Sequence, residues 1–290
     1  MDHAYRQYLA DGEMVGARYA LAAPRLVPLG LTGIQLGSRA GSSLEFKEHR
    51  EYQPGDDLRR IDWSAYARSD KLIVKLFREE VNPHLDLVID GSRSMDLSDT
   101  AKAQAALGLA AVFAAAAANS GYSHTAWITR DGCERIAHGN DRPGAWHDID
   151  FTTRTAPDES LGRTPPQWRT QGVRVFISDL LFLGDPLAVL DHLAHGSSGV
   201  CVVQLLAAAD VDPPQRGNIR LVDCETQQVR EVFVDAAAQQ RYRNQLAAHQ
   251  QNWHRAARQV GASMTTVVAE RLIENWDLSD LVATELLKLP

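Results

Sequence analysis

Short apolar segments that alternate with helical patterns are the feature of this sequence that most constrains its fold. Leu85–Ile89, Val173–Ile177 and Val200–Leu206 contain few polar residues, as do strands that are buried on both faces of a sheet. Helical patterns over 102–119 and 186–193 lie between them along the chain. Strands that alternate with helices form a parallel sheet covered on both sides. We therefore predict an α/β fold with a doubly wound, mainly parallel sheet.

The first part of the chain follows a less regular pattern. We expect a helix over 1–23, short extended pieces over 24–50, a short helix over 58–67 and a strand over 71–77. The predicted organisation is an N-terminal extension with short strands over 1–80, followed by an α/β domain over 81–290. After the sheet strands we expect a hairpin, a long helix over 236–260, a strand over 264–268 and a closing helix over 273–289.

Composition narrows the class of protein. The chain of 290 residues carries a formal net charge of −7, which argues against binding nucleic acid by neutralising its phosphates. Its longest apolar run, 105–118, is shorter than the roughly 20 residues that span a bilayer, and the polar N-terminus lacks the apolar core of a secretion signal. The cysteines Cys133, Cys201 and Cys224 form no paired motif. We therefore expect a cytoplasmic protein with no membrane span and no nucleic-acid partner.

A cluster of oxygen-bearing side chains follows two of the predicted strands. Asp90, Ser92 and Ser94 come directly after the first buried strand, and Asp179 comes just after the second. The carboxyl ends of parallel strands meet at one edge of a sheet, where ligands bind in α/β folds. Carboxylate and hydroxyl oxygens suit a hard cation such as Mg²⁺, or Mn²⁺. The competing interpretation is that these small polar residues only cap turns and helices.

The segment 44–70 is much richer in charged and aromatic residues than the rest of the chain. Its carboxylates offset its arginines, so we expect a salt-bridge and hydrogen-bond lattice that docks the segment on the sheet, rather than a nucleic-acid surface. The full block, 44–80, reads LEFKEHREYQPGDDLRRIDWSAYARSDKLIVKLFREE. It resembles the hallmark of the bacterial family called domain of unknown function fifty-eight (DUF58), with His49 where that family usually has a tyrosine.

The resemblance implies a von Willebrand factor A-like domain after this block. Asp90, Ser92 and Ser94 fall on the Asp-x-Ser-x-Ser motif of its metal ion-dependent adhesion site, and Asp179 falls on the Ser-Asp after its fourth strand. Such sites add a threonine from a loop between the third and fourth strands. Thr164 is the first candidate here, with Thr153 and Thr155 behind it, in TTRTAPDESLGRTPPQW. Arg93, within the loop, is expected to oppose a cation or to occupy its place.

Family members are typically encoded beside MoxR-type AAA+ ATPases, so the resemblance implies such an ATPase, or its client protein, as partner. We therefore expect a non-enzymatic protein-binding adaptor whose metal leaves a position for a partner's carboxylate. One alternative is a metal-dependent hydrolase of phosphate esters or nucleic acid, with Arg59 and Arg60 as phosphate contacts. The sequence shows no P-loop, no Gly-x-Ser-x-Gly and no His-Glu-x-x-His motif. A third possibility keeps the fold without any metal.

Overall fold

The computed structural model describes residues 3–22, 44–79, 83–212, 216–224 and 226–289. The chain divides into a large unit, Met1–Leu26 with Pro83–Pro290, and a smaller one, Val27–Asn82, here called the signature unit. The first helix thus belongs to the large unit, whereas the sequence suggested that residues 1–80 form one extension. Most of the extended pieces expected over 24–50 lie outside the described residues.

A six-stranded sheet forms the centre of the large unit, in the order β11-β8-β7-β4-β5-β6. Its strands are β4 (His84–Asp90), β5 (Ser123–Thr129), β6 (Cys133–Arg135), β7 (Val173–Ser178), β8 (Gly199–Leu206) and β11 (Ser263–Val268). All neighbouring pairs are parallel except β5 and β6, which are antiparallel. The prediction of an α/β fold with a mainly parallel sheet is confirmed.

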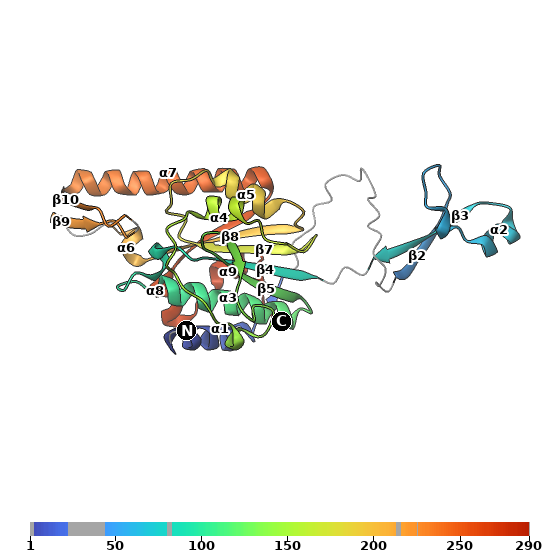
Figure 1. Cartoon of the computed structure of the whole chain (residues 1–290), viewed down its shortest axis with the longest axis horizontal. Helices are drawn as coiled ribbons and strands as arrows, with labels where there is room; N and C mark the ends of the chain where they lie inside the picture. Colours follow the sequence, from blue (N-terminus) through green and yellow to red (C-terminus); the bar gives the residue numbers. More distant parts are fainter. Residues whose placement is uncertain (1–2, 23–43, 80–82, 213–215, 225, 290) are drawn as a thin grey trace. The chain divides into compact units, whose positions relative to one another are not determined.

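Helices cover both faces of this sheet (Figure 1). On one face, α3 (Lys102–Asn119) packs with α1 (His3–Gly16) in a core that includes Leu85 and Leu87 of β4. On the other face, α5 (Pro186–Ala194) and α7 (Ala236–Val260) share a core with Val88. Successive side chains of a strand point to opposite faces, so an apolar strand supplies both cores at once.

The remaining elements of the large unit are short. Between the sheet strands lie η2 (Arg93–Asp96), η3 (Pro143–Ala145), α4 (Pro157–Arg163) and α6 (Ala208–Val211). Beyond them come β9 (Gly217–Val222) and β10 (Val229–Val234), which form the expected hairpin. No helix in the described part of the chain is long and apolar enough to cross a membrane.

The expected closing helix over 273–289 is wrong. The structure has α8 (Ala269–Asn275), α9 (Ser279–Ala283) and β12 (Leu287–Lys288), which pairs with β1 (Ala20–Leu21). Trp276 ends α8 in the left-handed conformation, with φ of 50°. Its ring lies against Gly108 of α3, where an added Cβ would come within 2.4 Å of it. The packing of this ring therefore coincides with a break in the helix, which the apolar periodicity of the sequence did not indicate.

Glycines allow α1 and α3 to approach closely. A Cβ on Gly12 would overlap the backbone carbonyl of Gly108, and one on Gly16 would come within 2.6 Å of the carbonyl oxygen of Val112. These atoms belong to the backbone, so they cannot move aside as a flexible side chain does. The contact therefore requires glycine at both positions of α1.

We expect Gly12→Ala to lower the free energy of unfolding by about 1–3 kcal/mol, because α1 must move away from α3. Gly162→Ala is the matched control, since Gly162 lies in α4 and an added Cβ there meets only the His192 ring at 3.8 Å. Urea unfolding of the three proteins measures the difference. Equal stability of Gly12→Ala and native protein would contradict the close helix contact.

The signature unit contains the antiparallel pair β2 (Leu44–Glu51) and β3 (Ile73–Glu79), with η1 (Leu58–Arg60) and α2 (Trp63–Ser69) between them. Asp62 joins these elements. One carboxylate oxygen accepts hydrogen bonds from the backbone of Ser64 and Ala65, both at 3.0 Å, and so caps α2. The other oxygen lies 3.0 Å from His49 Nε2 on β2 and 3.4 Å from Lys75 Nζ on β3.

A second carboxylate fixes the turn after β2. Asp56 accepts a hydrogen bond from Arg50 Nη2 at 2.7 Å and one from the backbone of Gln53 at 2.8 Å. Gly55 has a φ of +108°, a conformation that favours glycine. Charged contacts of the predicted kind are therefore present within the signature unit. The expected docking of the segment on the sheet stays a prediction. Arg59, named as a phosphate contact, is exposed, and the side chain of Arg60 lies outside the described residues.

The hydrogen bond from the Ala65 backbone is the main cause that lowers the pKa of Asp62 to about 2, and the contacts with His49 and Lys75 add to it. Burial acts in the opposite direction. A carboxyl whose pKa falls on folding stabilises the fold above its ordinary pKa of 3.8 and loses that contribution as the pH falls toward 2. We expect hydrogen-exchange protection of α2 to fall over that interval in native protein. Asp62→Asn should lower protection and flatten this pH dependence, and the exposed-site control Asp70→Asn should not.

Candidate functional site

The carboxyl ends of β4 and β7 form the candidate site. The two strands are parallel neighbours, with Ile89 opposite Ile177. Asp90 ends β4, and Asp179 follows the last residue of β7. The expectation that these two carboxylates emerge side by side is therefore met. Both are 1 % exposed, so the site is a buried polar cluster below the surface of this edge.

Asp90 is held by hydrogen bonds at both carboxylate oxygens. Ser178 Oγ donates to Oδ2 at 2.6 Å, and the Ser92 backbone donates to Oδ1 at 2.9 Å. Thr129 Oγ1, at the end of β5, lies 3.4 Å from Oδ1. Burial, with the nearby charge of Asp179, raises the pKa of Asp90 to about 6, although the bonds from Ser178 and Ser92 oppose this.

The loop after Asp90 places two hydroxyls together. Ser92 Oγ and Ser94 Oγ are 3.0 Å apart. Thr153 lies beside this loop, because its backbone pairs with Gly91 and Arg93 at 3.3 and 3.2 Å. Arg93 turns away from the carboxylates and donates from Nε to the Thr152 carbonyl. The expected role of Arg93 as the opposing charge therefore finds no support in its contacts.

The structure does not bring Thr164 to the loop by any described contact. Thr164 ends α4 and packs against Gly132 in the β5–β6 turn, where an added Cβ would come within 2.7 Å of its Oγ1. Thr155 donates its hydroxyl to Asp131 at 2.9 Å. Thr153, a second-rank candidate, is the threonine that the chain places next to Ser92. A nearby glycine, Gly162, was a poor guide here, because α4 lies between Thr153 and Thr164.

A lysine that the sequence interpretation missed neutralises Asp179. Lys102 Nζ, at the start of α3, lies 2.9 Å from Asp179 Oδ2 and 3.3 Å from Asp210 Oδ2. The lysine side chain is 1 % exposed. The second oxygen of Asp179 accepts a hydrogen bond from the Leu181 backbone at 3.0 Å. A signal for this role existed in the sequence, since Lys102 begins a predicted helix that is otherwise mainly apolar.

These contacts decide how well the cluster fits a divalent cation. The hydroxyls of Ser92 and Ser94, with Thr153 beside them, resemble the donors of a magnesium site. The two carboxylates do not fit, because the Lys102 ammonium, 2.9 Å from Asp179, would repel a second cation, and each of the four carboxylate oxygens already gives one lone pair to a protein donor. Among the described residues, no group of three or more His, Cys, Asp or Glu side chains could hold a metal ion. As arranged, the residues present do not fit Mg²⁺ or Mn²⁺.

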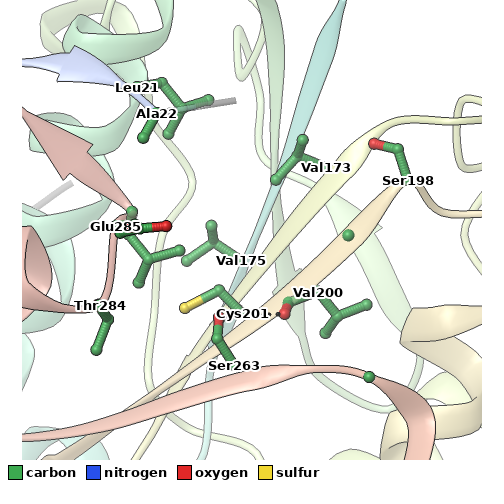
Figure 2. A pocket seen from close by; sticks show the side chains of 13 residues that line it. Leu21, Ala22, Val173, Val175, Ser198, Val200, Cys201, Ser263, Thr284 and Glu285 are labelled. Carbon is green, nitrogen blue, oxygen red and sulfur yellow. Dashed lines mark hydrogen bonds between the residues drawn. The ribbon is translucent and has the colours of Figure 1, made fainter. Parts of the chain in front are cut away.

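The cavities near the sheet include a polar cleft and a smaller cavity. A polar cleft of about 390 Å³, lined by Arg130, Asp150 and Thr153 among others, adjoins the Ser92 loop through Thr153. A second cavity, of about 190 Å³, is lined by β7, β8, β11 and the segment after α9 (Figure 2). Cys201 lines it, and burial raises the pKa of this thiol to about 12. The thiol therefore stays protonated and is a poor nucleophile.

We expect Ser178→Ala to lower the free energy of unfolding by about 1–3 kcal/mol, because it leaves a buried oxygen of Asp90 without its donor. Ser197→Ala is the control, since that hydroxyl donates to the Ala194 carbonyl at 3.0 Å in a less buried position. We expect the control to change stability by less than about 0.5 kcal/mol. Chemical unfolding compares the two, and an equally small effect of both would contradict the hydrogen-bonded state of Asp90.

Comparisons with known proteins place the sequence in a family. Uncharacterised proteins of Mycobacterium tuberculosis and Mycobacterium bovis are 29% identical over 266 residues, which cover 87% of this chain and 82% of theirs. Among solved structures, BatB from Bacteroides thetaiotaomicron is 11% identical, with a TM-score of 0.36, over 69% of this chain and 98% of that one.

The PilB minor pilin of Streptococcus sanguinis is 10% identical to this chain, with a TM-score of 0.38, over 74% of this chain and 64% of the pilin. TM-scores this low do not establish a shared fold. The sequence itself matches the family described as "Protein of unknown function DUF58" over residues 48–252, which is more than half of the chain. The protein therefore belongs to the DUF58 family.

Proposed function

We propose that this protein is a non-catalytic protein–protein interaction module of von Willebrand factor A-like type, which binds its partner at the carboxyl edge of the large sheet. A MoxR-type AAA+ ATPase, or a client of that ATPase, is the partner that the family resemblance suggests. The protein and its partner would meet in the cytoplasm. The proposal is supported mainly by the segment that follows Asp179. Two leucines of this segment are exposed, and buried residues hold its backbone through hydrogen bonds.

Residues 180–183, Leu-Leu-Phe-Leu, divide between the core and the surface. Leu180 is buried, and the Phe182 ring packs edge-on against Trp253 of α7 at a centroid distance of 5.7 Å. Leu181 is 39% exposed, and Leu183 is fully exposed. A partner that covers these leucines would stabilise the complex by about 25 cal/mol for each Å² of apolar surface buried.

The backbone beneath these leucines is held by the site itself. Ser178 Oγ accepts a hydrogen bond from the Leu180 backbone at 2.9 Å, and Asp179 holds the Leu181 backbone in the same way. His249 Nε2 of α7 contacts the Leu180 carbonyl at 2.6 Å. An apolar segment that is already ordered loses little conformational entropy when it binds, which favours affinity.

The same contacts argue for a binding role over hydrolysis. A general base needs a carboxylate or imidazole within reach of a substrate proton. Asp90 and Asp179 are buried and accept hydrogen bonds from protein donors at every oxygen. A substrate proton would therefore have to reach a buried oxygen that already accepts a hydrogen bond, which disfavours the hydrolase alternative.

The test is direct binding of the purified MoxR-type ATPase from the same organism, with and without ATP, to native protein and to Leu183→Asp. We expect the substitution to weaken binding at least about tenfold, because it places a charge at the centre of an apolar contact. Met14→Asp is the control, since Met14 is 67% exposed on α1, on another surface of the large unit. Equal weakening by both variants, or no binding by native protein, would overturn the proposal.

A further inference from the structure

Lys102 occupies a position where an ammonium group is unfavourable unless carboxylates surround it. The side chain is 1 % exposed, and transfer of a charge from water into a protein interior is costly. Lys102 is also the first residue of α3, where the partial positive charge of the helix N-terminus opposes a cation. A charged lysine at this place is therefore stable only if negative charges lie close to it.

Two carboxylates from different elements supply these negative charges. Asp179 follows β7 and Asp210 lies in α6, after β8, so the ammonium joins the ends of two neighbouring strands. Burial lowers the pKa of Lys102, but the charges and hydrogen bonds of Asp179 and Asp210 outweigh it and hold the pKa above its ordinary value of 10.5. The group therefore remains a cation at any physiological pH.

We propose that Lys102 is a built-in counter-charge that takes the place of a divalent metal at the carboxyl edge of the sheet. The geometry carries this proposal in three ways. Lys102 Nζ is bonded to the carboxylate that the metal hypothesis requires, at 2.9 Å. The other oxygen of Asp179 is bonded to the Leu181 backbone. Asp90, the second required carboxylate, has its own donors in Ser178 and Ser92.

This inference changes what the edge can recognise. A bound metal with an open position attracts a partner's carboxylate, and the contact then responds to metal and to chelators. A buried ammonium has no open position and is always present. The edge is therefore ready to bind in the absence of any divalent ion, through apolar contact beside Leu181 and Leu183. The inference about Lys102 does not depend on which partner binds there.

The test uses MnCl₂ alone as the probe, with calorimetry and thermal unfolding of the full chain. Native protein should give no saturable heat with Mn²⁺, and its melting temperature should be the same in EDTA and in MnCl₂. Lys102→Ala frees the carboxylate of Asp179 and opens space beside it. This variant should be less stable, should gain saturable Mn²⁺ binding, and should be stabilised by Mn²⁺. Adding Asp90→Asn to it should abolish both gains.

Saturable Mn²⁺ binding by native protein that is lost in Asp90→Ala would overturn the proposal, as would a folded Lys102→Ala that never binds Mn²⁺. If Lys102→Ala does not fold, Lys102→Met with Asp179→Asn decides. This pair removes both charges of the ion pair at similar volume, so it should fold and stay insensitive to Mn²⁺ and EDTA. Saturable Mn²⁺ binding by that pair, or a melting temperature that differs between MnCl₂ and EDTA, would contradict the proposal. Partner binding is measured separately, so its failure is distinguishable.

Discussion

Charge compensation at the carboxyl ends of β4 and β7 is the constraint on which the rest of the site depends. Parallel pairing brings Asp90 and Asp179 to one edge, and both are buried, so their negative charges repel in a medium that screens poorly. Lys102 neutralises Asp179 at 2.9 Å, and hydroxyl and backbone donors stabilise Asp90. These contacts also fix the start of the Leu180–Leu183 segment, so the buried charges and the exposed leucines form one arrangement.

The Asp-x-Ser-x-Ser pattern is therefore compatible with two kinds of site. Its hydroxyls, Ser92 and Ser94, lie 3.0 Å apart, as ligands of one ion could. Its carboxylate, Asp90, is directed instead to protein donors. A pattern of oxygen-bearing residues specifies which donors are near one another, but it does not specify what balances their charge. In this chain the balancing group comes from the first residue of α3, which lies outside the pattern.

The predictable and unpredictable parts of the structure differ in how local their signals are. The sheet strands, α3 and α7 follow from hydrophobic periodicity, and the meeting of Asp90 with Asp179 follows from strand order. Thr164 was preferred because it lies two residues after Gly162, but the pairing of Thr153 with Ser92 depends on how residues 146–156 return to the sheet. The break at Trp276 depends on a ring packing against Gly108, a contact between residues far apart in sequence. The role of Lys102 could be predicted only from its burial and its two carboxylate partners together.

A crystal structure of the native protein grown in MnCl₂, with anomalous scattering measured for manganese, decides whether Lys102 or a metal ion balances the charge of Asp179. We predict that Lys102 Nζ lies within hydrogen-bond distance of the carboxylates of Asp179 and Asp210, and that no anomalous peak lies beside Ser92 and Ser94. An anomalous peak within coordination distance of those hydroxyls and Asp90, with Lys102 displaced from Asp179, would contradict this prediction.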